Sequence, residues 1–300
     1  MIENTIEIII CWFRDIKNYF TEVIIEKEVK IVKIKVFPDA DEWVRKQLID
    51  KYNFKIEYID DLIEQYYKLP YFKINENIHE VLKEFKVDIK MTDDLQKVVK
   101  LFTTYHCTNM FQAMKVDLND PNTQREISEG NIGTPGRFAK MMIGKNQEDD
   151  SELLSGRWIK KPRLASFPNE NTSREIPITK RVDIVAVCSH HIAPFSSMFR
   201  EDAYALISYI PEDKVLGISK LQRLADWIGR RGWLQEDLSI KLFQEISDAA
   251  ETKNVYVRLY NIVHNCEFLR GTQSNDGAFT SEYYDGKFKD KKYRDMVLQK

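Results

Sequence analysis

The stretch SKLQRLADWIGRRGWLQEDLSIKLFQEISDAAETKNVYVRLYNIVHNC, residues 219–266, decides the fold that we expect. Apolar residues recur in it at helical spacing and predict helices over 219–230 and 235–251. The recurring residues are Leu221, Leu224, Ala225 and Ile228 in the first helix, and Leu238, Leu242, Ile246 and Ala249 in the second. The stretch then continues into a predicted strand over 255–267.

Further strands are expected on both sides of this stretch. The patterns predict strands over 181–188 and 203–210 before it, and over 279–284 after it. Together the elements form a β-β-α-α-β-β unit, which is typical of an α+β fold with an antiparallel sheet and its helices on one face.

The N-terminal part carries no recognisable reactive cluster. A strand is predicted from Val29 to Phe37, followed by helices over 41–52, 58–68 and 76–86. We therefore expect a module of unknown role over residues 1–90, and a catalytic domain over 91–300.

The catalytic domain is expected to open with two helices. Thr92 is a good N-cap for a helix that runs toward Met110, because Asp93 and Asp94 follow it. Thr134-Pro135 predicts the start of a shorter helix that carries Arg137 and Lys140.

Composition excludes several classes of protein. The 300 residues carry a formal charge of -2, so no excess of basic residues points to nucleic acid. The early apolar stretch from Ile8 to Phe13 is too short to span a membrane, and we expect a cytoplasmic protein. The cysteines are scattered and form no disulfide framework; they are Cys11, Cys107, Cys188 and Cys266.

Two clusters of cysteine and histidine suggest a metal site: Cys188-Ser189-His190-His191 and His264-Asn265-Cys266. A catalytic zinc ion takes three protein ligands and keeps a fourth position for water, a count that two thiolates and one imidazole satisfy. Residues two apart on a strand share a face, so His264 and Cys266 are expected to enter one cavity. A structural zinc with a fourth protein ligand, and ordinary strand residues without metal, stay open as alternatives.

Charged residues near the predicted helices suggest a phosphorylated purine. Lys220 and Arg223 lie three apart at a helix start, where backbone N–H groups also favour anions. Arg270 follows Cys266 by four residues, close enough to reach a phosphate. Glu236, next to Gln235, could accept from the N1–H and the exocyclic amine of guanine. Taken singly, these residues also fit a solvated helix face, a surface ion pair and a first-turn carboxylate.

In combination, these motifs resemble the GTP cyclohydrolase I family in their order and spacing. Besides the two Cys-His clusters, the similar stretches are Val215-Leu216-Gly217-Ile218-Ser219-Lys220-Leu221-Gln222-Arg223, Gln235-Glu236, Arg270-Gly271 and Thr134-Pro135-Gly136-Arg137-Phe138-Ala139-Lys140. The resemblance covers roughly residues 92–290.

The resemblance implies a T-fold and a toroidal homo-oligomer with active sites between subunits. It implies that Cys188, His191 and Cys266 hold Zn²⁺ and that His190 and His264 transfer protons. It also implies two substrate-binding groups: Gln235 and Glu236 for guanine, and Ser219, Lys220, Arg223 and Arg270, with Arg137 and Lys140 of a neighbouring subunit, for the triphosphate.

The implied reaction converts GTP to 7,8-dihydroneopterin triphosphate and formate, in pterin and tetrahydrofolate biosynthesis. Histidines that titrate near neutral pH suit its repeated proton transfers. One alternative is a T-fold relative acting on another purine or pterin, such as the nitrile reductase of deazapurine biosynthesis. Gly217-Ile218-Ser219-Lys220 stands where that enzyme has a Glu-Ser-Lys type motif. The other alternative is a zinc-binding assembly protein with impaired catalysis.

The chain departs from the family pattern at three places. Ser189 stands where the family has Glu, which removes a carboxylate beside the metal ligands. The segment from Ser196 to Ala203 is longer than usual and predicts an enlarged hairpin loop. Gly277 and Phe279 stand at positions that usually carry hydroxyl groups, while Thr280 and Ser281 keep the pattern.

Overall fold

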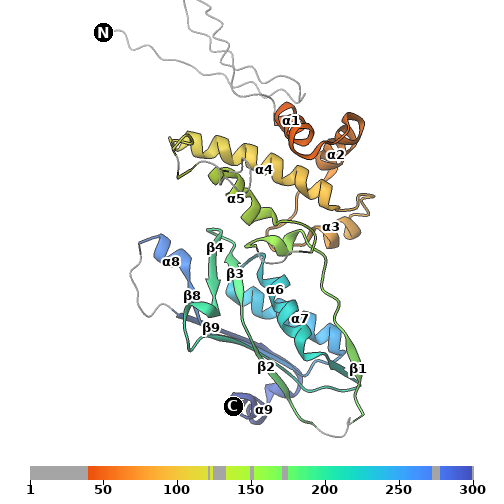
Figure 1. Ribbon diagram of the computed structural model, residues 1–300. Coiled ribbons are helices and arrows are strands. Elements are labelled where there is room, and N and C mark those ends of the chain that lie inside the picture. Colours follow the sequence, from red (N-terminus) through yellow and green to blue (C-terminus); the bar gives the residue numbers. More distant parts are fainter. Residues whose placement is uncertain are drawn as a thin grey trace, which may run out of the picture. The chain divides into compact units, whose positions relative to one another are not determined.

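The computed structural model describes residues 40–120, 122–123, 133–148, 152–170, 175–271 and 278–298 (Figure 1). The strand predicted from Val29 to Phe37 lies outside these residues, as do Cys11 and Gly277. The chain forms two compact units, one ending at Glu64 and the other beginning at Gln65. The separate role predicted for residues 1–90 stays a prediction.

The first unit contains helix α1 (Ala40–Tyr52) and the start of helix α2 (Ile56–Lys68), which confirms the helices predicted there. Val44 and Leu48 lie one helical turn apart on α1, and both are fully buried. Arg45 of α1 forms an ion pair with Asp60 of α2. An exposed pair of this kind contributes at most about 1 kcal/mol, so apolar burial is the larger stabilising term.

The second unit begins with a helical part. It contains α3 (Ile78–Glu84), α4 (Asp93–Ala113), α5 (Gly133–Ile143) and the 3₁₀ turn η1 (Ser155–Arg157). Thr92 caps α4 as predicted, because its hydroxyl accepts a hydrogen bond from the Leu95 N–H at 3.2 Å. Helix α5 starts at Gly133, one residue before Thr134. None of the helices in the described ranges is long and apolar enough to cross a membrane.

The main sheet has the strand order β2-β5-β8-β4-β3-β7. In addition, β9 pairs with the edge of β8 that faces away from β5. A small second sheet pairs β1 with β6. The strands are β1 (Ser166–Pro168), β2 (Ile178–Val182), β3 (Val185–Cys188), β4 (Ala193–Ser196), β5 (Tyr204–Tyr209), β6 (Lys214–Leu216), β7 (Gly232–Trp233), β8 (Val255–His264) and β9 (Ala278–Tyr284). The pairs within the main sheet are antiparallel except β3 with β7.

The single strand predicted over 181–188 is two strands in the structure. The Ser196 hydroxyl donates to the Ile184 carbonyl at 2.7 Å, and the Ile184 N–H donates to the Ser197 hydroxyl at 2.9 Å. These side chains take the place of ladder partners at Ile184. As a result β2 pairs with β5, whereas β3 turns to pair with β4 and β7.

The strand predicted over 255–267 ends earlier, at His264, and the chain continues as the short helix α8 (Asn265–Leu269). A bulge interrupts β8 at Asn261, whose φ of 52° is a left-handed conformation that asparagine tolerates. The Asn261 side-chain amide donates to Asp202 at 2.8 Å. The long segment from Ser196 to Ala203, which contains the turn η2 (Ser197–Phe199), is thereby attached to the bulge.

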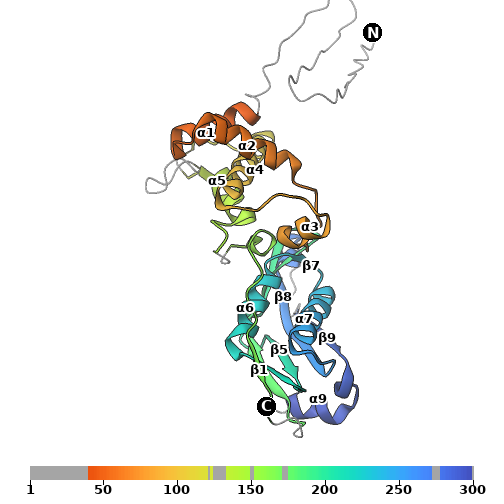
Figure 2. The same ribbon diagram turned by 90° about the vertical axis from the view of Figure 1, so that its right-hand side faces the viewer.

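Helices α6 (Ile218–Gly229) and α7 (Gln235–Ala250) lie along the sheet (Figures 1 and 2). Their predicted apolar residues are buried in one core with Ile207 of β5 and Val257 of β8, apart from Ala249, which is partly buried. The alternate residues Leu206 and Tyr256 point to the opposite face. There they pack with Phe288 and Val297, from the turn η3 (Gly286–Lys289) and the C-terminal helix α9 (Lys291–Leu298).

Gly156 joins the helical part of the second unit to α6. A Cβ atom at this position would lie 2.2 Å from the Trp227 carbonyl oxygen and 2.7 Å from that of Arg230. The Gly156 carbonyl also accepts hydrogen bonds from the buried side chains of Asn77 and Arg231, at 2.8 and 3.2 Å. Only glycine permits this approach of two backbones.

We expect Gly156→Ala to lower the free energy of unfolding by about 3 kcal/mol, because both clashing atoms belong to the backbone. Urea denaturation followed by circular dichroism measures the change. Gly217→Ala is the control, since its Cβ would meet nothing closer than 3.4 Å and should cost less than about 1 kcal/mol. Equal stabilities of the two variants would contradict the close packing of η1 on α6.

Candidate metal centre and active site

Cys188 and His191 lie on one tight turn between β3 and β4. The Ile192 N–H donates to the Cys188 carbonyl at 2.9 Å and closes the turn. Ile192 has a φ of 51°, a left-handed conformation that strains a β-branched residue by about 1–3 kcal/mol. The turn folds His191 back over Cys188, so that the Cys188 Sγ lies 3.8 Å from the His191 Nδ1.

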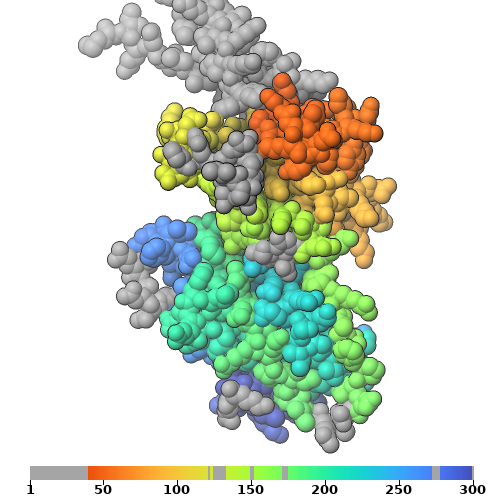
Figure 3. Space-filling model, in the orientation of Figure 1, coloured from red at the N-terminus to blue at the C-terminus, as the bar shows by residue number. Residues whose placement is uncertain are grey.

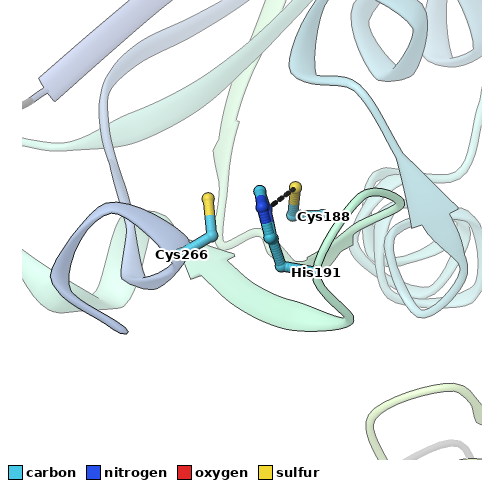
Figure 4. A group of neighbouring side chains, drawn as sticks. All are labelled: Cys188, His191 and Cys266. Atoms are coloured by element: carbon cyan, nitrogen blue, oxygen red, sulfur yellow. Dashed lines mark hydrogen bonds between the residues drawn. The ribbon is translucent and has the colours of Figure 1, made fainter. Parts of the chain in front are cut away.

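Cys266 on α8 completes a group of three potential metal ligands (Figure 4). The ligand atoms of Cys188, His191 and Cys266 all lie within 4.8 Å of one another, and Figure 4 shows the three side chains converging. Tetrahedral zinc places sulfur and nitrogen ligands about 3.6–3.8 Å apart, so this donor set fits the ion after a small adjustment. The prediction that Cys266 shares a strand with His264 was wrong, because Cys266 lies in the first turn of α8.

The electrostatics of the two thiols favour a cation between them. Burial, and next the neighbouring Cys188, raise the pKa of the Cys266 thiol. A divalent cation stabilises the thiolates and offsets both effects. In the described part of the chain the group has three members, and the His190 ring lies 6.1 Å from the His191 ring at nearly a right angle. Three potential protein ligands would leave a fourth position open, a count typical of catalytic rather than structural zinc sites.

His264 is held between two aromatic rings at the end of β8. Its imidazole stacks on Phe195 of β4, with ring centres 4.4 Å apart and planes 4° from parallel. The edge contact with Phe279 of β9 has ring centres 5.2 Å apart. Burial lowers the pKa of His264, and the charge of Glu236 opposes this in part. The imidazole is therefore neutral at physiological pH.

Gln235 and Glu236 begin α7 and face different surroundings. Gln235 is only 4% exposed, and its amide oxygen lies 2.7 Å from the His264 Nε2. Its amide nitrogen donates to the Phe279 carbonyl and the Ser281 hydroxyl. Glu236 is exposed and lies close enough to influence His264. The structure thus brings the predicted guanine-reading pair to one of the predicted proton-transfer histidines.

Three of the predicted phosphate ligands have no ion pair among the described residues. They are Lys220 and Arg223 on α6 and Arg270 after α8; Arg223 and Arg270 are exposed, as is Ser219. The unit that carries them has acidic residues elsewhere that do pair, such as Glu245 with Lys161 and Lys241. Lys220 and Arg223 lie near the N-terminus of α6, a position that suits an anionic ligand, whereas Arg270 follows the C-terminus of α8. Figure 3 shows the α8 segment at the molecular surface.

Arg137 and Lys140 on α5 have partners from their own part of the chain. Arg137 donates to the Thr134 hydroxyl at 3.2 Å, and Lys140 pairs with Glu152 at 3.7 Å. Lys100 of α4, which the sequence patterns did not single out, belongs to the same basic group. Burial, and next the charges of Lys140 and Lys97, lower the pKa of Lys100, whereas Glu152 opposes the change.

Three more residues contact the site residues, although the sequence did not predict these contacts: Phe195, Ser239 and Ser281. Phe195 lies in a short strand that no periodicity predicted. Ser239 and Ser281 are joined by a hydrogen bond of 2.7 Å between α7 and β9. The one sequence signal for this pair was that Ser281 keeps the hydroxyl pattern of the family.

Comparison with known proteins supports the resemblance found in the sequence. The family model "GTP cyclohydrolase I" matches residues 107–300, which is more than half of the chain. The chain belongs to the GTP cyclohydrolase I family. The α+β fold expected for this family, its T-fold, is confirmed, and so is the prediction that the chain is an enzyme of this family.

Several bacterial proteins named GTP cyclohydrolase 1 are similar to the chain. The protein of Flavobacterium johnsoniae is 26% identical over 215 residues, which is 71% of this chain and 84% of the relative. The protein of Clostridium beijerinckii is 31% identical over 174 residues, 57% of this chain and 81% of the relative. A crystal structure of the archaeosine synthase QueF-Like in the apo form aligns at 18% identity over 37% of this chain and 93% of that one, with a TM-score of 0.27. That structural likeness is too weak to inform the fold.

We expect Lys100→Met to raise the melting temperature at pH 7 by about 2–4 °C in phosphate-free buffer, because the buried charge is costly in the folded state. A lysine with a lowered folded-state pKa destabilises the protein while it is charged. The difference should therefore shrink as the pH rises toward 10.5, where the unfolded chain also loses the proton.

Differential scanning fluorimetry with and without inorganic triphosphate tests the same basic group. Triphosphate should stabilise the wild type more than Lys100→Met, since the anion relieves repulsion among the lysines. Lys97→Met is the matched control, because Lys97 is already paired with Asp94 at 2.7 Å. A lower melting temperature for Lys100→Met than for the wild type at pH 7 would contradict the buried-charge assignment.

Proposed function

We propose that this chain hydrolyses GTP to 7,8-dihydroneopterin triphosphate and formate, within pterin and tetrahydrofolate biosynthesis in the cytoplasm. The observation that carries the proposal is the convergence of Cys188, His191 and Cys266 close to His264 and Glu236. Two potential ligands that lie 78 positions apart in the sequence, Cys188 and Cys266, meet at the ends of β3 and β8. Glu236, which we propose for purine recognition, is close enough to influence His264 at the same end of β8.

Cys188, His191 and Cys266 would hold Zn²⁺. The donor set has the softness and the count of a catalytic zinc site. When bound, the ion would supply hydroxide at neutral pH, because zinc lowers the pKa of water to about 7.

His264 and His190 would move the protons that the ring opening and closure require. The lowered pKa of His264 keeps its imidazole neutral, so one ring nitrogen accepts a proton while the other donates. Phe195 and Phe279 fix the plane of the ring. His190 is exposed beside His191, where it can exchange protons with solvent between steps.

Substrate recognition would be divided between a base site and a phosphate site. Glu236 at the start of α7 would accept from the guanine N1–H and amine, with Gln235 beside it. Lys220, Arg223 and Arg270 would bind the triphosphate with help from Ser219. Arg137 and Lys140 would join from a neighbouring subunit, which makes a homo-oligomer part of the proposal.

The first test follows formate release and pterin absorbance with GTP and zinc-loaded protein. The wild type should release one formate for each GTP consumed, and Cys266→Ala should lose activity by at least about 10⁴-fold and most of its bound zinc. Cys107→Ala is the control, because Cys107 is a buried cysteine on α4 outside the ligand group. Zinc binding through these ligands without formate release would favour the impaired assembly protein. Turnover of another purine instead of GTP would favour the T-fold relative.

The second test compares GTP with ITP, whose base lacks the exocyclic amine. Glu236→Gln should lower kcat/KM for GTP by about 10- to 100-fold, because it removes a charged hydrogen bond to two donors. The effect on ITP should be smaller, so the preference for GTP shrinks. Asp237→Asn, at the next residue of the same helix, should change kcat/KM for GTP and for ITP by less than about 2-fold. An undiminished preference for GTP in Glu236→Gln would remove Glu236 from base recognition.

A further inference from the structure

A continuous set of hydrogen bonds runs from His264 into the backbone of α7. The His264 Nε2 lies 2.7 Å from the Gln235 amide oxygen. The Gln235 amide nitrogen lies 3.1 Å from the Phe279 carbonyl oxygen and 3.2 Å from the Ser281 hydroxyl. The Ser281 hydroxyl lies 2.7 Å from that of Ser239, which in turn lies 3.1 Å from the Gln235 carbonyl oxygen.

Chemistry determines the orientation of the Gln235 amide in this network. A backbone carbonyl only accepts hydrogen bonds, so the group that faces the Phe279 oxygen must be the NH₂. Either serine hydroxyl can donate to the other. In both arrangements the Ser281 oxygen keeps a lone pair that accepts the second Gln235 N–H. The amide oxygen is therefore the atom that faces His264.

The orientation of the amide determines the tautomer of His264. An amide oxygen cannot donate, so the Nε2 of His264 must carry the hydrogen. In the neutral form of the ring, which carries a single hydrogen, Nδ1 is then unprotonated. Among the described residues no hydrogen bond reaches Nδ1, and the ring cannot turn freely because it is stacked on Phe195.

We propose that Gln235 is a positioning residue that holds His264 as the Nε2–H tautomer, with the Phe279 carbonyl and the Ser281–Ser239 hydroxyl pair keeping its amide in place. Both amide hydrogens and one lone pair of the Gln235 amide are used inside the protein, and the residue is buried. This leaves little capacity for guanine, so base recognition falls mainly to Glu236. The effect of this tautomer on catalysis rests on the proposed function, whereas the assignment of the tautomer itself does not.

The tautomer is read directly from the protein without any substrate. Solid-state ¹⁵N NMR at pH 8, on protein labelled only at histidine Nδ1, distinguishes protonated from unprotonated nitrogen. The chain has five histidines, and His264→Asn identifies the signal of His264. The wild type should show an unprotonated Nδ1 at His264, and Gln235→Met, which keeps the length but removes the amide, should lose this single state.

Steady-state kinetics with GTP separate positioning from recognition. Gln235→Met should lower kcat by about 10- to 100-fold while KM changes less than about 3-fold. Ser281→Ala, a milder change that tests the support of the amide, should lower kcat by about 3- to 10-fold, and Ser281→Thr should restore it. Ser208→Ala is the matched control, because it breaks a hydroxyl pair with Thr179 in the same sheet, about 26 Å along β8 from His264.

Each outcome decides the proposal. A protonated Nδ1 at His264 in the wild type overturns it, whatever the activity. A rise in KM with unchanged kcat in Gln235→Met also overturns it, since that result assigns Gln235 to guanine. Equal kcat for Ser281→Ala and Ser208→Ala removes the serine pair from the mechanism. If no GTP is turned over, the proposed function fails, while the NMR result still decides the tautomer.

Discussion

The antiparallel pairing of Phe195 with His264 is the constraint on which the candidate site depends. It places the end of β4 against the end of β8, so the turn that carries Cys188 and His191 lies next to the point where the chain leaves β8. Helix α8 begins there and brings Cys266 to Cys188 and His191. A shift of one residue in this pairing would turn His264 to the other face of the sheet and separate the ligands.

The same unit divides stability and function between the middle and the end of its sheet. In the middle, the residues of β5 and β8 alternate between two apolar faces and are almost fully buried. At the end where β4 pairs with β8, the structure contains features that are energetically unfavourable in the absence of a ligand. Ile192 is in a left-handed conformation, and Arg270, directly after α8, has no partner among the described residues. Such local costs are typical of sites that gain their partners only when a ligand binds.

The departures from the family pattern gain a physical meaning from the structure. The Ser189 N–H donates to the Trp233 carbonyl at 3.1 Å and continues the pairing of β3 with β7, a backbone contact that does not depend on the side chain at this position. The charge that reaches His264 comes from Glu236. Phe279, at a position where hydroxyl groups are usual, supplies an aromatic edge to His264 and a carbonyl to Gln235.

The sequence by itself determined the amphipathic helices α6 and α7, the strands β5 and β9, and the two Cys-His clusters as a candidate metal site, because periodicity and residue chemistry are local properties. Only the tertiary structure decided that the strand over 181–188 breaks at Ile184 and that Cys266 lies on a helix. It also decided that Gln235 bonds to Phe279, 44 positions away. These features depend on which backbone groups find partners across the sheet, and a local pattern of apolar and polar residues does not specify those partners.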